Sequence, residues 1–292
     1  MTNMRTQGHS LVTICDYVNI SRQAYHKRLT KLNSKEQLYQ SLERVVLSNR
    51  QVKSRAGLRT IHYKEKLSSL LGINQFEQQM SALGYALKPY RSYLKTTDSR
   101  GHFYKFDNLI SGIDVLRENQ VIVGDITYYQ NVGKLYYIFH FQDYYTLEIK
   151  GLVGSTTMEG LNAEKCLRQV FDYNKQRKYN YQLKLHTDAG TQYRSRKFQS
   201  MLRKAQIQPS HAGNCFENGL SERANGIVKN EYLIDYDIRS VSQLNSVLRK
   251  IKYQANTVWP SKTLGYKTPK EFAQWIKKQK ANDRPIRTVK IV

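Results

Sequence analysis

The stretch VIVGDITYY, residues 121 to 129, constrains the fold more than any other part of the sequence. Its valine, isoleucine and tyrosine residues are typical of a strand in a protein interior, yet its centre is Asp125. A buried carboxylate is costly unless it is neutralised or paired with a cation. The chain must therefore fold so that another group compensates this charge.

A second carboxylate, Asp188, closes the strand-like run YQLKLHTD (181 to 188) just before Gly190. The end of a strand before a glycine turn is a common position for chemistry in α/β proteins. If the two strands are neighbours, Asp125 and Asp188 converge, and their charges repel unless a cation lies between them. The sequence thus predicts oxygen ligands for a divalent metal, Mg²⁺ or Mn²⁺.

A third ligand is expected from the helix predicted after residue 214, where Glu217, Glu222 and Glu231 are candidates. Glu222 is favoured because Lys229 lies seven residues later, two helical turns away on the same face. Lys229 could then hold a substrate phosphate beside the metal. Glu217 fits the helix start, where its charge suits the dipole, and Glu231 falls off that face.

The chain is strongly basic, with 47 Lys and Arg against 23 Asp and Glu and a net charge of +24. Residues 1 to 112 carry 18 basic and 7 acidic residues (+11), residues 113 to 239 carry 17 and 14 (+3), and residues 240 to 292 carry 12 and 2 (+10). Two basic flanks around a balanced centre favour a nucleic-acid partner over an anionic membrane.

The N-terminal flank is predicted to be helical. Residues 10 to 30 suit two short helices around a turn at Asn19, with Ser21 capping the second. That second helix would expose four residues of the types used to contact DNA, namely Arg22, Gln23, His26 and Lys27. An ordinary helical hairpin with a solvated basic face is an equal alternative, since short helix-turn-helix patterns are weak signals.

Five regions follow from this reading of the chain. They are a helix-turn-helix segment (1–34), a helical DNA-binding domain with helices over 35–52, 55–71 and 73–87 (35–88), a basic linker (89–112), an α/β core (113–240) and a basic C-terminal helical region (241–292). The tyrosine-rich linker could track a nucleic-acid backbone or be a plain solvated connection.

The central region alternates between strand-like and helical patterns. Strands are predicted over 120–129, 134–145, 146–153 and 181–188, and helices over 158–176, 195–206 and 217–233. Three meandering strands, a crossover helix and a fourth strand indicate a mixed α/β sheet with helices on its faces.

Three cysteines, far apart in the sequence, indicate a reducing compartment, and no Cys-x-x-Cys pair suggests structural zinc. The first residues contain no apolar signal core, and no run of about 18 apolar residues occurs. We therefore expect a cytoplasmic protein without a membrane partner.

The segments VGDITYY, LHTDAGTQY and GNCFENGLSERANGIVKNEYL, in this order, resemble the catalytic core of OrfB-type insertion-sequence transposases. These DDE enzymes belong to the retroviral-integrase superfamily and have a ribonuclease-H-like core. RAGLRTI resembles the helical region before that core, and NTVWPSKTLGYKTPKEF resembles the closing motif. The likeness spans most of the chain.

The resemblance implies that Asp125, Asp188 and Glu222 are the catalytic, metal-binding triad, and that Lys229 contacts the terminal DNA of the element. Arg223, beside the triad glutamate, is a further candidate DNA contact. Six residues match the flanking loops, and for these a structural role is favoured: Gly190, Gln192, Tyr193, Gly213, Asn214 and Asn218.

The implied reaction uses two Mg²⁺ or Mn²⁺ ions and no nucleotide. Zinc is not expected, because His9, His26 and Cys15 are too few and misplaced for the zinc-binding module of retroviral integrases. Expected partners are double-stranded DNA of the terminal inverted repeats and the target, with a homo-oligomer on DNA, in a bacterial cytoplasm associated with the nucleoid.

Three alternatives are open on the sequence. A ribonuclease-H-like nuclease would share the carboxylates but would not need two helical DNA-binding segments. A non-catalytic regulator descended from a transposase would have lost a ligand, whereas all three acidic positions are present. A glycosidase could use two of the acids but would not explain the net charge.

Overall fold

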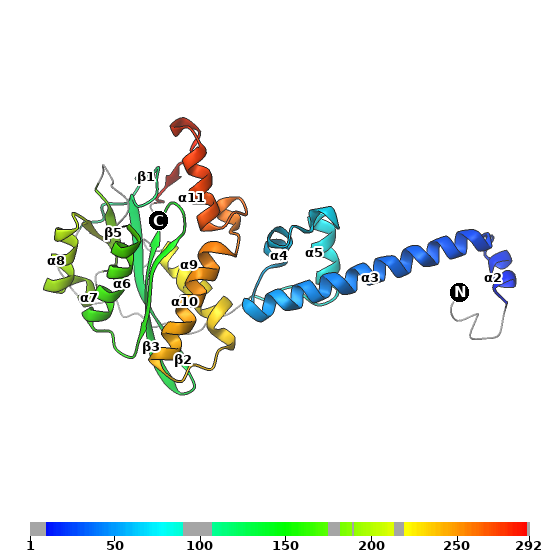
Figure 1. Cartoon of the computed structure of the whole chain (residues 1–292), viewed down its shortest axis with the longest axis horizontal. Coiled ribbons are helices and arrows are strands. Elements are labelled where there is room, and N and C mark those ends of the chain that lie inside the picture. The colour runs from blue at the N-terminus through cyan, green and yellow to red at the C-terminus, as the bar shows by residue number, and fades with distance from the viewer. Residues whose placement is uncertain (1–9, 90–106, 175–181, 189, 213–218, 291–292) are drawn as a thin grey trace.

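The computed structural model describes residues 10–89, 107–174, 182–188, 190–212 and 219–290. An α/β core carries a helical arm, in which the long helix α3 (Arg22–Val52) projects away from the core and α2 (Leu11–Tyr17) lies at its far end (Figure 1). No helix in the described ranges is long and apolar enough to cross a membrane.

The core is a mixed five-stranded sheet, which confirms the predicted fold class. The strand order is β4-β3-β2-β5-β6, with antiparallel pairing among the first three strands and parallel pairing of β2 with β5 and of β5 with β6. The strands are β2 (Val121–Asn131), β3 (Lys134–Asp143), β4 (Ile149–Ser155), β5 (Lys184–Thr187) and β6 (Gln208–His211).

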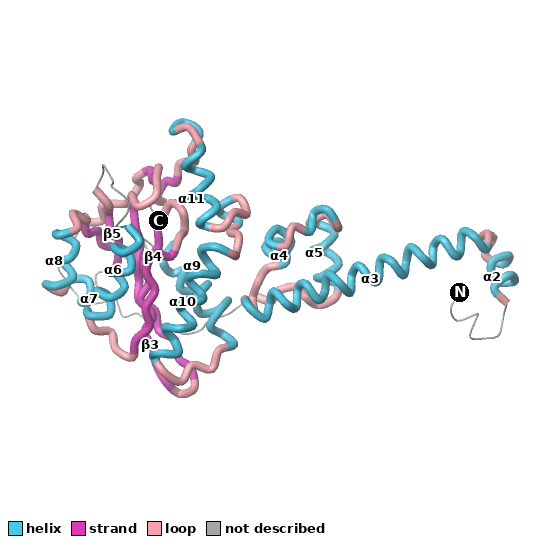
Figure 2. Tube along the Cα trace, viewed as in Figure 1, coloured by secondary structure: helices cyan, strands magenta, loops and turns pink. Residues whose placement is uncertain are grey.

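Helices cover both faces of this sheet, as Figure 2 shows. One face packs on α6 (Gly160–Asn174), α7 (Thr191–Arg194) and α8 (Arg196–Lys204), and the other on α9 (Gly219–Ile227) and α10 (Val241–Thr257). Glycines allow the close approach. A Cβ on Gly151 would lie 2.6 Å from the Cys166 oxygen of α6, and one on Gly154 would lie 2.4 Å from Leu244 of α10.

Gly124 has the same role within the sheet. It pairs with Phe141 across the β2–β3 ladder, and a Cβ at this position would lie 2.2 Å from the Phe141 ring. The Gly124–Asp125 dipeptide therefore combines a position that has no room for a side chain with one that carries the buried carboxylate. Strand β2 can hold both because successive residues point to opposite faces of the sheet.

Strand β4 is an edge strand, and side-chain amides satisfy its outward backbone groups. Asn256 accepts a hydrogen bond from the Ile149 N–H and donates one to its carbonyl, both at 2.9 Å. Gln169 does the same at Leu152 (3.1 and 3.2 Å), and Asn245 at Gly154 (2.9 and 2.8 Å). These three amides come from the helices on the two faces.

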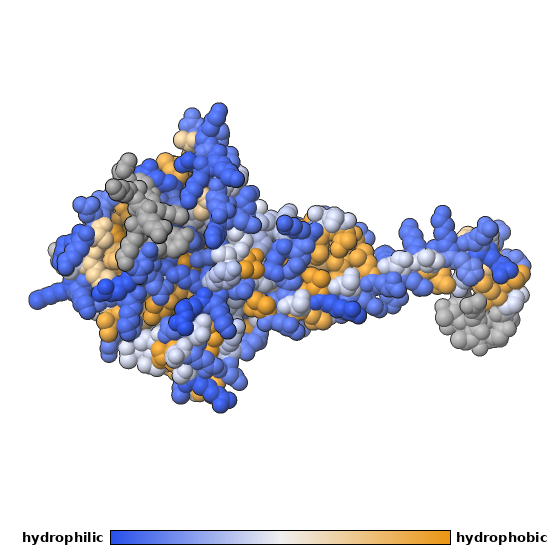
Figure 3. Space-filling view, in the orientation of Figure 1, coloured by the Kyte–Doolittle hydropathy of each residue, from blue (hydrophilic) through white to orange (hydrophobic). Residues whose placement is uncertain are grey.

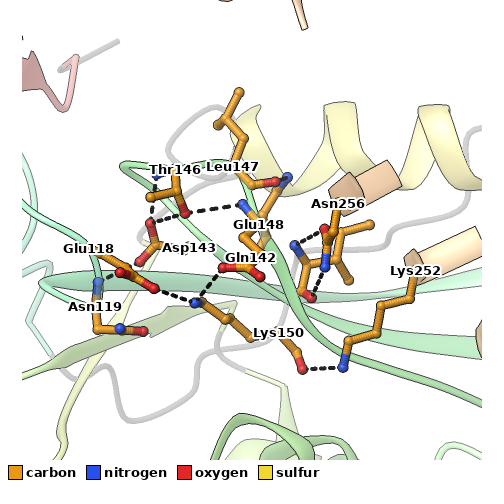
Figure 4. A network of polar contacts seen from close by, with 11 residues as sticks. Glu118, Asn119, Gln142, Asp143, Thr146, Leu147, Glu148, Lys150, Lys252 and Asn256 are labelled. Atoms are coloured by element: carbon orange, nitrogen blue, oxygen red, sulfur yellow. Dashed lines mark hydrogen bonds and ion pairs between the residues drawn. The ribbon is translucent and has the colours of Figure 1, made fainter. Parts of the chain in front are cut away.

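A buried polar network lies where β3 ends and β4 begins (Figure 4). The side chain of Lys150 is fully buried and pairs with Glu118 at 2.9 Å and Glu148 at 2.8 Å. Asp143 is also fully buried and accepts hydrogen bonds from the backbone of Asn119 and from Thr146. Burial raises the pKa of Asp143, and the nearby Lys150 and these hydrogen bonds oppose the rise.

The N-terminal turn has the predicted form. Ser21 Oγ accepts a hydrogen bond from the Ala24 N–H at 3.1 Å, and Asn19 adopts a left-handed conformation with φ of 53°. The predicted break between residues 30 and 35 is wrong, because α3 runs through it as one helix of 31 residues. The segment contains no glycine or proline to end the helix. The Ser34 hydroxyl donates a hydrogen bond to the Thr30 carbonyl one turn earlier, at 2.9 Å.

Shorter helices complete the arm. They are α4 (Leu58–Lys64), the 3₁₀ turn η1 (Leu67–Ser69) and α5 (Ile73–Ala82). The helix predicted over 55–71 is interrupted because Lys66 adopts a left-handed conformation with φ of 52°. Gly84, with φ of 89°, follows the end of α5, which is shorter than the predicted helix over 73–87. Most of the predicted linker, 90–106, lies outside the described residues.

The arm joins the core at the C-terminal end of α3. Lys53 forms an ion pair with Glu231 at 2.7 Å and lies 5.2 Å from the centre of a Trp259 ring. Lys64 of α4 also lies 5.1 Å from the centre of a Trp259 ring. Tyr63 stacks on Tyr266 with 3.7 Å between the ring centres. Apolar residues of the arm and of the core form one hydrophobic cluster here.

The C-terminal region is helical with a short strand. It contains α10, η5 (Lys262–Leu264), α11 (Pro269–Lys278), η6 (Ala281–Asp283) and β7 (Arg287–Thr288), which pairs with β1 (Asp114–Val115). Thr268 and Glu271 form a capping box at the start of α11. Hydrophilic residues cover much of the visible surface, while an apolar area lies over the arm near α4 and α5 (Figure 3).

We predict that Lys150→Met destabilises the fold by about 3–5 kcal/mol, because it leaves the buried carboxylate of Glu148 and the partly buried one of Glu118 without their cation. Arg59→Met is the control, since it breaks an exposed pair with Glu77 (2.7 Å) and should cost less than about 1 kcal/mol. Urea unfolding monitored by circular dichroism measures both. Equal losses for the two variants would contradict a stabilising role for the buried network.

Candidate active site

Parallel pairing of β2 with β5 brings the first two acids together. Val121 pairs with Lys184 and Val123 with His186, so the same register places Asp188 level with Asp125. Asp188 follows directly after the last residue of β5, and its carboxylate accepts a hydrogen bond from the Gly190 N–H at 3.1 Å. The two strands are therefore neighbours, which is the condition under which the sequence predicted that Asp125 and Asp188 converge.

Asp125 is partly buried, and its surroundings disfavour its charge. The pKa of this carboxyl is raised to about 7, chiefly by desolvation and also by the negative charges of Asp188 and Glu222. Asn225 and the Ile126 backbone oppose the rise. Burial also raises the pKa of Asp188, against the Gly190 hydrogen bond and the nearby His211. Negative charge is therefore in excess at this end of the sheet.

Glu222 lies in the first turn of α9 and is exposed, within electrostatic reach of Asp125. Of its two competitors, Glu231 is engaged by Lys53 in the ion pair with the arm. Glu217 lies outside the described residues, together with Gly213, Asn214 and Asn218. Tyr193 is buried in the turn after Asp188 and packs on Phe141 and Phe198.

Asn225 belongs to the site, although the sequence did not single it out. Its Nδ2 donates a hydrogen bond to Asp125 Oδ2 at 2.7 Å. It lies three residues after Glu222, which places it one helical turn further along α9 on the same side. That three-residue spacing from Glu222 is the sequence signal that could have identified Asn225 as a site residue. The hydrogen bond fixes one Asp125 oxygen and ties the helix that carries Glu222 to the strand that carries Asp125.

His140 faces Asp125 across the β2–β3 ladder. The imidazole is 2% exposed, and burial lowers its pKa to about 4 despite stabilising interactions with Asp125 and Asn225. The ring is therefore neutral at physiological pH and does not supply the positive charge that the acids lack.

Lys229 lies in a π-helical turn, η3 (Val228–Tyr232), that continues α9. Its Nζ is 5.9 Å from the centre of the Tyr128 ring on β2. Burial lowers the pKa of Lys229, and the charge of Asp125 opposes this. The predicted relation to Glu222 assumed a regular helix. The π turn intervenes, yet Lys229 still lies near Asp125.

The residues that could hold a metal are Asp125, Asp188 and Glu222. No group of three or more His, Cys, Asp or Glu side chains among the described residues forms a ready metal centre. The fit therefore rests on donor chemistry. Three carboxylates offer oxygen ligands of the kind preferred by Mg²⁺ and Mn²⁺, and the raised Asp125 pKa marks charge that a cation would compensate.

The other predicted DNA contacts lie on exposed surfaces. Arg22, Gln23, His26 and Lys27 occupy the first turns of α3, at the end of the arm away from the core. Arg223 is exposed on α9 beside Glu222. The structure brings Lys229 near Asp125, keeps Arg223 next to Glu222 on the exposed side of α9, and leaves the α3 group apart from the acidic residues.

Comparison with known proteins agrees with this architecture. Two family models, both described as integrase core domain, match residues 116–214 and 203–269. A transposase for insertion sequence element IS904 from Lactococcus lactis is 28% identical over 200 residues, covering 67% of this chain and 78% of that protein. A putative transposase for IS986/IS6110 from Mycobacterium tuberculosis is 32% identical over 120 residues, covering 39% and 43%.

Among solved structures, the chain is similar to the HTLV-2 integrase catalytic core domain in complex with magnesium. The TM-score is 0.43 with 20% identity, and the match covers 57% of this chain and 99% of that one. A simian T-cell lymphotropic virus intasome structure matches with a TM-score of 0.47 and 17% identity, covering 82% and 76%.

We predict that Asp125→Asn raises the melting temperature of the metal-free protein at pH 8. Because the folded-state pKa of Asp125 lies above its ordinary value, wild-type stability falls as the pH rises from about 4 to about 7. The variant lacks this loss, so its advantage should grow over that range to several degrees. Thermal melts from pH 5 to 8 measure it.

Added Mg²⁺ should stabilise the wild type more than Asp125→Asn, since the variant offers one carboxylate fewer. Asp235→Asn makes the same chemical change at an exposed position, and it should match the wild type throughout. A variant that melts below the wild type at pH 8 without Mg²⁺ would contradict the predicted carboxylate repulsion.

Proposed function

The chain belongs to the insertion-sequence transposases of the retroviral-integrase superfamily, and we propose that it cleaves the ends of its element and joins each freed 3′-hydroxyl to DNA. The proposal is supported by the β2–β5 register, which sets Asp125 and Asp188 at one level of the sheet, and by Glu222, which lies within electrostatic reach of Asp125.

Asp125, Asp188 and Glu222 would hold up to two divalent cations. When bound, such a pair supplies activation of the attacking oxygen and stabilisation of the leaving oxygen in an in-line displacement at phosphorus. Asn225 would hold Asp125 in place through its hydrogen bond to Oδ2. Lys229, near Asp125, would neutralise a phosphate of the end DNA.

Two displacements complete the reaction. In the first, a water oxygen bonds to phosphorus at the element end, the phosphodiester P–O bond breaks, and a 3′-hydroxyl is released. In the second, that hydroxyl loses its proton and bonds to a target phosphorus, while the target 3′-oxygen leaves and gains a proton. The number of phosphodiester bonds is conserved in the second step, so joining needs neither a nucleotide nor a covalent protein intermediate.

The basic flanks would bind the DNA that is joined. Residues 1–34 and 35–88 would contact the terminal inverted repeats, the linker 89–112 would follow the backbone, and 241–292 would contact DNA or a second protomer beside the core 113–240. Because two ends must be brought together, we propose that the chain acts as a homo-oligomer on DNA.

We predict that Glu222→Gln abolishes strand transfer while sparing DNA binding. Loss of one metal carboxylate should forfeit several kcal/mol of transition-state stabilisation, hence about a thousandfold or more in rate. The assay uses labelled element-end DNA, a plasmid target and Mg²⁺ or Mn²⁺. Glu77→Gln is the control, because it neutralises an exposed carboxylate on α5 outside the core.

Three outcomes separate the alternatives. Joining that is lost in Glu222→Gln supports a DDE transposase with this triad. Nicking without joining by the wild type would indicate a hydrolytic nuclease. A wild type that binds its element ends but shows no metal-dependent chemistry would indicate a regulator and would overturn the metal-ligand assignment.

A separate prediction concerns DNA contacts. Lys27→Ala on the arm and Lys229→Ala at the site should each weaken binding of the end, and each should make the dependence of log K on log salt shallower by about one unit. Fluorescence anisotropy between 50 and 200 mM salt measures the slope. An unchanged slope for either variant would show that this lysine does not contact phosphate.

A further inference from the structure

The π-helical turn η3 has two sides with different neighbours. Lys229 points toward β2, where it lies over the Tyr128 ring and feels the charge of Asp125. Glu231, two residues later, points toward the arm and pairs with Lys53 at 2.7 Å. Single π-helical turns are rare and occur frequently at functional sites. One short turn therefore contacts both the site and the arm.

Several contacts fix the arm side of this turn. The Ser54 hydroxyl donates to the Glu231 carbonyl at 3.4 Å, and Lys53 lies 5.3 Å from the centre of the Tyr232 ring. Val228 and Tyr232 belong to the same buried cluster as Leu42 of α3. Polar and cation–π contacts thus hold the turn against the residues that directly follow α3, and the turn shares a hydrophobic cluster with α3 itself.

Lys53 is the C-terminal cap of α3, so its ion pair with Glu231 lies at the end of the helix that joins the core. A helix of 31 residues is about 46 Å long. The exposed residues Arg22 and Lys27 lie at its other end. A displacement of that end would be transmitted to the core at the C-terminal end of the helix, where Lys53 and Glu231 form their ion pair.

We propose that Glu231 is a positioning residue: its ion pair with Lys53 holds the π-helical turn so that Lys229 faces the Asp125 site, and thereby couples the arm to phosphate binding at the core. This inference rests on the proposed function, since it takes Lys229 as a DNA contact. It adds that the arm and the active site are one coupled unit rather than two independent DNA-binding parts.

The test reverses charges at the pair. Glu231→Lys and Lys53→Glu each place like charges opposite one another, whereas the double swap restores an ion pair with the same total charge. We expect each single reversal to weaken end-DNA binding about fivefold or more, and the swap to recover most of the loss. Folding is checked by thermal melts, and Glu231→Gln replaces Glu231→Lys if the reversal does not fold.

A cycle with Lys229→Ala distinguishes positioning from a general structural role. If Glu231 acts through Lys229, the effect of changing Glu231 disappears once Lys229 is alanine. A general structural role gives the same loss in both backgrounds and overturns the proposal. Failure of the swap to restore binding also overturns it.

The two hypotheses fail in different ways. Strand transfer that survives in Glu222→Gln would reject the proposed site. Strand transfer lost in Glu222→Gln, with wild-type end binding in Glu231→Lys and Lys53→Glu, would retain the site and reject the coupling.

Discussion

The parallel pairing of β2 with β5 is the constraint on which the rest of the structure depends. It puts Asp125 and Asp188 at one level of the sheet, and α9 then adds Glu222 through the tether from Asn225 to Asp125. Both neighbours of Asp125 raise its pKa, and the histidine opposite is neutral. The protein without metal therefore carries an electrostatic penalty at this point, which an added cation would relieve.

The fold can sustain this penalty because other buried charges are fully partnered. Lys150 has two carboxylates, and Asp143 has backbone and hydroxyl donors. The Lys150 network and the Asp125 site are both built from acidic residues and lysine, with opposite results. Where β3 ends and β4 begins, the acids are matched by the cation of Lys150, whereas at the site three acids share Lys229 as the lysine that the described residues place near Asp125.

Sequence reasoning predicted the interior strands because their β-branched and aromatic residues have a clear pattern. It missed β6, which contains Pro209 and Ser210, and it divided α3 at Asn33 and Ser34, residues that are weak helix formers but do not break a helix. Periodicity also gave no sign of the π turn, since that turn depends on tertiary packing. The partner of Glu231 could not be inferred, because Lys53 is distant in the sequence and contacts it only through the fold.

The amides along β4 have a consequence for how copies of this chain can associate. An edge strand with free backbone groups is a template on which another chain can add a strand. Here Asn256, Gln169 and Asn245 already occupy the places that such a strand would take. The opposite edge, β6, contains Pro209, which has no N–H to donate. The sheet is thus poorly suited to grow at either side. In the proposed homo-oligomer, protomers would therefore meet through helices and side chains, and the same design guards the chain against aggregation through its sheet edges.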